Sequence, residues 1–246
     1  MKRLLVIILA SILTLTLLSG CGKEAKPSWQ KEIDENTAAS KHTLLFIDDG
    51  RTSNAKNIKN SMIKLAEKLS DQFVFVYVDY TKEKDNLLKY LNTSSLSEFP
   101  LTLSIAPSGL ISGGFTKQCT EDELKATIIS GKEEEILLSL QKGLVSLLCI
   151  YNGETEKLSD VKKSLKTIET NYGGVIVTHY LDTTNDTDKE FINKLPKVTG
   201  DITVMITVPP GSIKATLTDE EITLTNLLST IQSSCGSGGC GTGGCG

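Results

Sequence analysis

Three unrelated residue types recur at one spacing along this 246-residue chain, and that spacing limits the folds open to it. Each marker ends an apolar run or opens a turn, and each is met again 102 or 103 positions later. The pairs are Gly50 and Gly153, Asp79 and Asp182, and Pro107 and Pro209. A shared offset at three markers indicates an internal duplication of about 100 residues. We therefore predict two similar domains, 42–141 and 142–232, with a single elongated α/β domain as the alternative.

Strand and helix patterns follow one another in the same order in both halves. The continuous apolar run 43–47 predicts a buried strand, and Thr120 with Glu123 is a capping-box pattern that opens a helix. In the first half we predict strands at 43–47, 73–78, 101–105 and 110–115, with helices around 58–69, 87–91 and 120–129. In the second half we predict strands at 144–150, 175–181, 202–208 and 213–217, with helices around 158–168, 191–195 and 224–231. The fold class is α/β, with a central mixed sheet flanked by helices in each half.

This element order, together with several segments of the first half, resembles the thioredoxin-like superfamily. The segments are Trp29–Lys41 followed by 44–48, Phe99–Pro100 before a strand, and Pro107–Gly109 before a strand with Gly114. The resemblance covers roughly 29–129 and implies two tandem thioredoxin-like domains, with a structural cis-proline at Pro100. It is weaker in the second half, where Asp201–Ile202 stands in place of Phe99–Pro100.

The redox motif of that superfamily is absent from both halves. Active members carry Cys-x-x-Cys at the start of the first helix, where the helix dipole lowers the pKa of the first thiol. Aligning Lys56 with the lysine that often follows the motif places Thr52 and Ala55 at the two thiol positions, and 152–156 also lacks cysteine. We predict redox-inactive domains that act as binding modules. Arg51 beside a helix start could instead form an anion site; the alternative is a plain helix cap by Thr52 or Ser53.

The amino-terminal segment resembles the signal peptide of bacterial lipoproteins. Lys2 and Arg3 precede the uncharged apolar run 4–18, and Leu18-Ser19-Gly20-Cys21 resembles a lipobox. The resemblance implies that 1–20 is removed, that Cys21 carries lipid such as palmitate, and that 21–41 is a tether with a possible first helix from Trp29. Several acyl chains give stable anchoring, so we expect the cell envelope, on the extracytoplasmic face of the membrane. The alternative is an ordinary secretory signal with a chance cysteine.

The remaining cysteines fall into two groups. Cys119 is isolated, and Cys149 lies inside a predicted strand, where a small buried thiol is expected. The glycine-rich segment 233–246 is predicted to be a flexible tail and repeats a thiol every five residues, at Cys235, Cys240 and Cys245. Three thiolates suit a thiophilic metal such as Cu(I) or Zn, although the spacing differs from that of structural zinc sites. Disulfide exchange, covalent modification and an inert tail are the alternatives.

These observations lead to one functional prediction with two alternatives. We predict a membrane-anchored lipoprotein whose domains hold an envelope protein partner and whose tail binds metal or carries thiols. The first alternative is an atypical thiol-disulfide oxidoreductase that uses Cys235, Cys240 and Cys245, with Cys119 as a further candidate. The second is a structural envelope protein with an inert tail. A net charge of −4 argues against nucleic acid as a partner, and His42 and His179 are predicted to be strand residues rather than ligands.

Overall fold

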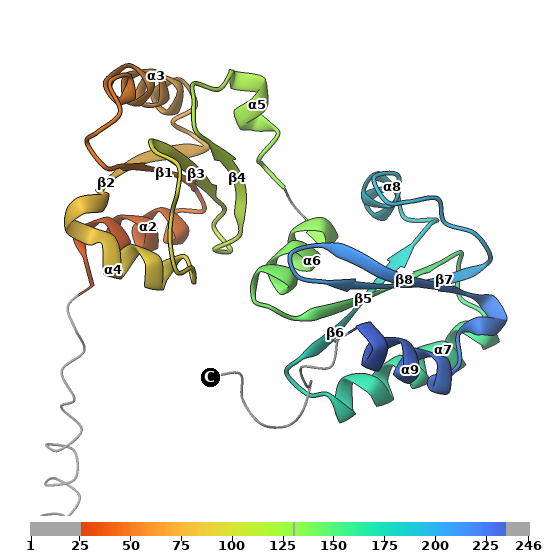
Figure 1. Cartoon of the computed structure of the whole chain (residues 1–246). Coiled ribbons are helices and arrows are strands. Elements are labelled where there is room, and N and C mark those ends of the chain that lie inside the picture. The colour runs from red at the N-terminus through yellow and green to blue at the C-terminus, as the bar shows by residue number, and fades with distance from the viewer. Residues whose placement is uncertain (1–25, 130, 235–246) are drawn as a thin grey trace, which may run out of the picture.

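The computed structural model describes residues 26–129 and 131–234, which form two α/β units one after the other (Figure 1). The first unit consists of α2 (Ser28–Ala38), β1 (His42–Asp48), α3 (Ala55–Lys68), β2 (Phe73–Asp79), α4 (Tyr80–Tyr90), β3 (Leu101–Ile105), β4 (Ile111–Phe115) and α5 (Glu121–Lys125). The second consists of α6 (Gly131–Gln141), β5 (Val145–Tyr151), α7 (Glu156–Asn171), β6 (Ile176–Asp182), α8 (Asp186–Ile192), β7 (Ile202–Val208), β8 (Ser212–Thr218), the 3₁₀ turn η1 (Asp219–Glu221) and α9 (Leu224–Ser234).

Each unit has one four-stranded mixed sheet, and the two sheets have the same topology. The strand orders are β2-β1-β3-β4 and β6-β5-β7-β8. In both sheets the first strand runs parallel to the second and antiparallel to the third, and the third pairs with the fourth as a hairpin. With helices on the faces of each sheet, this is the arrangement of two tandem thioredoxin-like domains, so the predicted fold class is confirmed (Figure 1).

The repeated sequence markers have the same physical role in both domains. Gly50 and Gly153 both have φ of +73°, in the left-handed region that favours glycine, directly after the first strand of each sheet. Asp79 ends β2 and its carboxylate accepts a hydrogen bond from the Thr81 N–H at 3.0 Å. Asp182 ends β6 and accepts in the same way from Thr184 at 2.8 Å. The duplication is therefore visible in the backbone turns as well as in the strand order.

Burial of the central strands explains their unbroken apolar sequences. In β1 and β5 six of seven residues are buried, because each strand lies between two sheet neighbours and has helices over both faces. The core around α2 and α4 in the first domain contains Trp29, Ile33, Leu45, Ile47, Val76, Val78, Leu87, Leu103 and Ile105. The largest core cluster of the second domain lies between β5 and the helices α7 and α9.

Helix α6 changes the predicted boundary between the domains. Its Ile136 and Leu140 pack with Leu148, Ile150 and Met205 of the second sheet. It also lies 103 positions after α2, with the same length of 11 residues. The second domain therefore starts with α6 near residue 131, whereas the sequence analysis assigned 131–141 to the first domain.

Several helix ends also differ from the predictions: α4 starts at Tyr80 where 87 was predicted, and α8 covers Asp186–Ile192 where 191–195 was predicted. The helix predicted over 120–129 does begin with the capping box of Thr120 and Glu123, but it ends at Lys125. The Thr127 hydroxyl donates to the Leu124 carbonyl at 2.7 Å and pairs with the Ser104 hydroxyl at 2.8 Å, which draws the chain toward β3. At the other end of the chain, α9 runs to Ser234, so the first two residues of the predicted tail are helical.

Some predictions concern residues outside the part of the chain that the structure describes. These are the signal peptide 1–20, the lipid attachment at Cys21, and the tail thiols Cys235, Cys240 and Cys245. Across 26–129 and 131–234, no helix is long and apolar enough to cross a bilayer.

Candidate functional site

The candidate site lies where β1 ends and α3 begins, on a loop shaped by its own carboxylates. Asp48 and Asp49 each accept a hydrogen bond from a backbone N–H two residues on, at Gly50 and Arg51, both at 3.0 Å. These turns reverse the chain at the end of a buried strand. The loop is thus fixed by local bonds before helix α3 begins at Ala55.

Thr52, which the alignment on Lys56 places at the first thiol position, is bonded to the proline loop. Its hydroxyl donates to the Phe99 carbonyl at 3.0 Å. The Phe99–Pro100 peptide bond is cis, the geometry that the family resemblance implies there. Ala55, at the second thiol position, is 5% exposed and contributes only a methyl group to the core. Neither side chain can form or reduce a disulfide, since both lack sulfur.

An anion site at this helix start receives little support from the side chains. Arg51 is 85% exposed at its side chain, and its Nε lies 3.9 Å from the Asp49 carboxylate. The residue before α3 is Asn54, whose amide oxygen accepts from the Asn57 side chain at 2.9 Å rather than capping the backbone. The predicted cap by Thr52 or Ser53 is therefore wrong, because α3 begins later and the Thr52 hydroxyl is used by Phe99.

Aromatic side chains border the loop on the side of α4. The rings of Tyr80 and Phe99 lie 4.6 Å apart between centroids. Trp29 of α2 is 3% exposed, and its indole N–H donates to the Glu83 carboxylate at 3.3 Å. These contacts link the starts of α2 and α4 to the segment before Pro100. The sequence showed the proline and the lead-in helix, but it gave no signal for this pairing of Tyr80 with Phe99.

The corresponding place in the second domain is closed by a carboxylate. One oxygen of Asp219 accepts from the backbone N–H groups of Asp201 and Ile202, both at 3.1 Å. The start of α7 is also capped within the protein, because the Thr155 hydroxyl accepts a hydrogen bond from the Leu158 N–H at 3.1 Å. The backbone N–H groups at this position of the second domain are therefore already bonded within the protein.

The two cysteines within the described chain are in environments that suppress thiolate chemistry. Cys119 is half-buried with its Sγ 3.7 Å from the Met62 sulfur, and burial, with the nearby Glu123 charge, raises its pKa to about 11. Cys149 is fully buried in β5, and burial raises its pKa to about 12. Both thiols are thus protonated at neutral pH and are poor nucleophiles. Neither is brought beside Thr52 by a contact.

The His, Cys, Asp and Glu side chains of the described parts of the domains do not gather into a metal-binding cluster. Among residues 26–129 and 131–234, no group of three or more His, Cys, Asp or Glu side chains is placed to hold a metal ion. His42 and His179 lie buried in β1 and β6, as predicted, and burial lowers the pKa of each. The metal hypothesis for Cys235, Cys240 and Cys245 stays a prediction.

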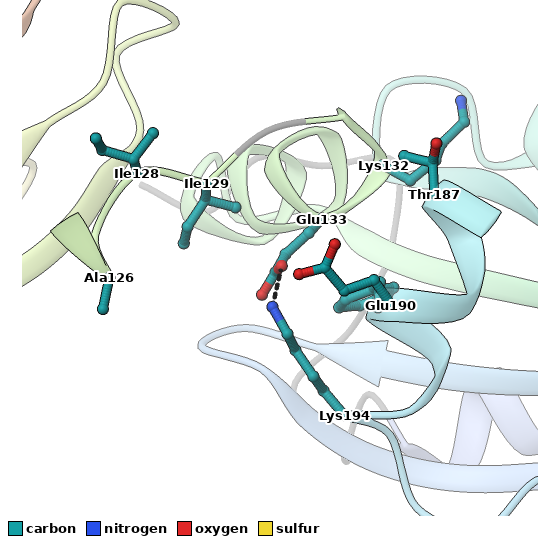
Figure 2. A pocket seen from close by; sticks show the side chains of 9 residues that line it. Ala126, Ile128, Ile129, Lys132, Glu133, Thr187, Glu190 and Lys194 are labelled. Carbon is teal, nitrogen blue, oxygen red and sulfur yellow. Dashed lines mark hydrogen bonds and ion pairs between the residues drawn. The ribbon is translucent and has the colours of Figure 1, made fainter. Parts of the chain in front are cut away.

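A pocket that the sequence did not signal lies between the segment after α5 and helix α8 (Figure 2). Ile128, 39% exposed, lines it together with Ile129. On the side of the second domain, Glu133 and Lys194 form an ion pair at 2.6 Å. Lys132, which also lines the pocket, pairs with Glu135 outside it at 2.8 Å, so both lysines of the lining are already used in ion pairs. We interpret the pocket as a seam between the domains rather than as a ligand site.

Among known proteins, similarity to this chain is found in solved structures at low sequence identity. No family model matches the chain, and no curated protein matches it. Among solved structures, it is similar to the N-terminal domain of alkylhydroperoxide reductase AhpF from Enterococcus faecalis, with 13% identity, coverage of 82% of this chain and 97% of that one, and a TM-score of 0.31. It is also similar to the first two thioredoxin domains of Saccharomyces cerevisiae Eps1p, with 13% identity, coverage of 87% and 98%, and a TM-score of 0.32. Human ERp44 matches with 13% identity, 83% of this chain and 54% of its own, and a TM-score of 0.35.

Proposed function

We propose that this chain is a lipoprotein anchored at the extracytoplasmic face of the membrane, whose first domain binds an envelope protein without exchanging disulfides. One observation carries the proposal. The thiol positions hold Thr52 and Ala55, and the Thr52 hydroxyl is bonded to the Phe99 carbonyl beside Pro100. The scaffold that would place a nucleophile against a peptide is thus kept while the nucleophile is absent.

The tail has a separate role in this proposal. Cys235, Cys240 and Cys245 supply the accessible thiols and bind a thiophilic metal such as Cu(I) or Zn near the membrane. The high pKa of Cys119 and the burial of Cys149 support this division, because they leave the domains with little thiol reactivity of their own. The competing function for the tail is disulfide exchange, and the remaining alternative is a tail with no chemical role.

A disulfide-reduction assay separates binding from catalysis. The full chain is expected to reduce a protein disulfide no faster than the dithiol reductant alone. Introducing Thr52→Cys together with Ala55→Cys is expected to create activity, because it places a Cys-x-x-Cys pair just before α3 and beside the cis Phe99–Pro100 bond. The matched control, Thr52→Ser with Ala55→Ser, is expected to stay inactive. Reduction by the unmodified chain that is lost on replacing the three tail cysteines with serine would favour the oxidoreductase alternative.

A metal titration tests the tail. Under reducing conditions, the full chain is expected to bind Cu(I) or Zn, and the variant with Cys235→Ser, Cys240→Ser and Cys245→Ser is expected to lose that binding. Cys119→Ser is the control and is expected to change nothing, because its thiol is half-buried and protonated. Equal metal uptake by the triple variant would rule out the tail as the site. For the anchor, Cys21→Ala is expected to abolish lipid labelling and membrane attachment.

A further inference from the structure

We infer that the end of the first domain carrying Thr52 and Pro100 faces the bilayer, and that its partner is an extended segment of another protein lying next to the membrane surface. This inference rests on the anchoring at Cys21 in the proposed function. It adds an orientation and a class of partner, both of which follow from where α2 begins and where the second domain attaches.

Helix α2 begins at the same end of the first domain as the candidate site. Its last turn lies at the start of β1, where the Asn36 side chain donates to the Thr43 hydroxyl at 3.0 Å. Its first turn reaches the first turn of α4, where Trp29 donates to Glu83. Helix α4 follows directly after β2, and the ends of β1 and β2 lie side by side in the parallel register. The starts of α2, α3 and α4 therefore share one end of the sheet (Figure 1).

The distance from this end to the lipid is limited by the sequence. Only the seven residues from Cys21 to Pro27 precede α2 on the lipidated side. Even if fully extended, seven residues span at most about 25 Å. An anchor at Cys21 therefore holds the start of α2 within that distance of the headgroups, and the loop carrying Thr52 lies at the same end of the sheet.

The second domain is attached at the opposite end. In the antiparallel register Thr43, near the start of β1, lies opposite Ile105, so the turn between β3 and β4 is at the far end from Thr52. Gln141 of α6 grips this turn, accepting from the Ile111 N–H at 2.7 Å and donating to the Gly109 carbonyl at 2.9 Å. Ser108 adds a hydrogen bond to Glu134 of α6 at 2.6 Å. The second domain is thus held away from the membrane, and the Thr52 end stays free to face it.

The space between the headgroups and the Thr52 end of the first domain limits the size of the partner. A folded domain of 100 residues has a radius of gyration of about 13 Å, so its diameter exceeds roughly 25 Å. A single extended strand needs only about 5 Å in the plane of a sheet and about 10 Å across it. An extended segment that leaves the bilayer therefore fits between the membrane and the aromatic pair of Tyr80 and Phe99, whereas a folded domain from the bulk compartment does not.

Fluorescence quenching in vesicles tests the orientation. The lipidated full chain, with every cysteine except Cys21 replaced, receives one labelled thiol at Arg51→Cys or, as the matched control, at Asp71→Cys. Both positions are exposed and charged, but Asp71 precedes β2 at the opposite end of the sheet. Headgroup quenchers in the vesicle are expected to quench the label at 51 more strongly than the label at 71. Equal quenching, or stronger quenching at 71, would overturn the orientation.

Access of a bulky reagent tests the partner class. On vesicles, the thiol at 51 is expected to react with a small maleimide but to lose reaction with a high-molecular-weight polyethylene glycol maleimide, whereas the thiol at 71 reacts with both. A long Gly-Ser insertion after Gly22 is expected to restore the bulky reaction at 51. If the bulky reagent reaches 51 without the insertion, folded partners have access and the inference is wrong. Lipid labelling is measured first: a chain without lipid contradicts the anchoring itself, while a lipidated chain that fails the quenching test contradicts only the orientation.

Discussion

The grip of Gln141 on the β3–β4 turn allows a direct test of how the two domains are joined. Gln141→Ala removes one acceptor and one donor, those bonded to the Ile111 N–H and the Gly109 carbonyl. A typical net hydrogen bond contributes about 0.5–1.5 kcal/mol. Because Gln141 is exposed, the lower value applies to each bond, and we expect a total loss of about 1 kcal/mol. A change of this size shifts an opening equilibrium by about fivefold.

Amide hydrogen exchange at Ile111 reports this loss at a single atom. The Ile111 N–H donates to the Gln141 side chain, so in Gln141→Ala its exchange is expected to accelerate by about fivefold. The matched control is Gln141→Glu, which keeps an acceptor for Ile111 and loses only the donor to Gly109; exchange at Ile111 is expected to stay close to that of the unmodified chain. Unchanged exchange in the alanine variant would refute the grip and would remove one support for a distal second domain.

Two further predictions follow from burial of titratable groups. In the variant whose three tail cysteines are serine, alkylation of Cys119 is expected to be slow at neutral pH and to accelerate as the pH rises toward about 11, because burial disfavours the thiolate. A time course of alkylation, measured by mass spectrometry, tests this expectation. Rapid modification of Cys119 at pH 7 would contradict it. Burial lowers the folded-state pKa of His42 and His179 below the ordinary value of 6.5. The unfolded chain therefore binds more protons than the folded chain at acidic pH, and the free energy of unfolding is expected to fall as the pH drops below about 6.5. Urea unfolding at pH 7.5 and 5.5 measures it, and replacing both histidines with glutamine is expected to reduce the difference.

Strands were easier to predict from the sequence than helix ends. The runs at β1 and β5 are apolar because both faces of a central strand are covered, and the sequence records that burial directly. No helix was predicted over 131–141, and these residues were placed in the first domain, whereas they form α6 of the second domain. The apolar residues of a helix do not record which sheet the helix covers. The early end of α5 depends on Thr127 meeting Ser104 across 23 positions, a contact that no local pattern encodes.

The candidate site was predictable by position but not by contact. Alignment with the family motif predicts where Thr52 and Ala55 lie. It does not predict which contacts these residues make in place of the missing cysteines. The bond from Thr52 to Phe99 depends on how the loop after β1 meets the loop before β3, which are 47 positions apart. Asp219, whose carboxylate binds the N–H groups of Asp201 and Ile202, has a backbone φ of +44°. The sequence around it did not predict this conformation.

The two domains repeat one fold, but their equivalent loops differ in how their backbone groups are bonded, and this difference bears on the proposal that the first domain binds the partner. In the second domain the N–H groups of Asp201 and Ile202 already have an acceptor in Asp219, so a partner there would have to displace a charge-assisted bond. In the first domain Pro100 offers no N–H, and the Phe99 carbonyl is shared with a single hydroxyl, from Thr52, while a carbonyl oxygen can accept two bonds. An extended partner can use that second lone pair without breaking any bond in the protein. These contacts support the proposal that the first domain binds the partner and that the second, joined through Gln141 at the far end, holds it in position.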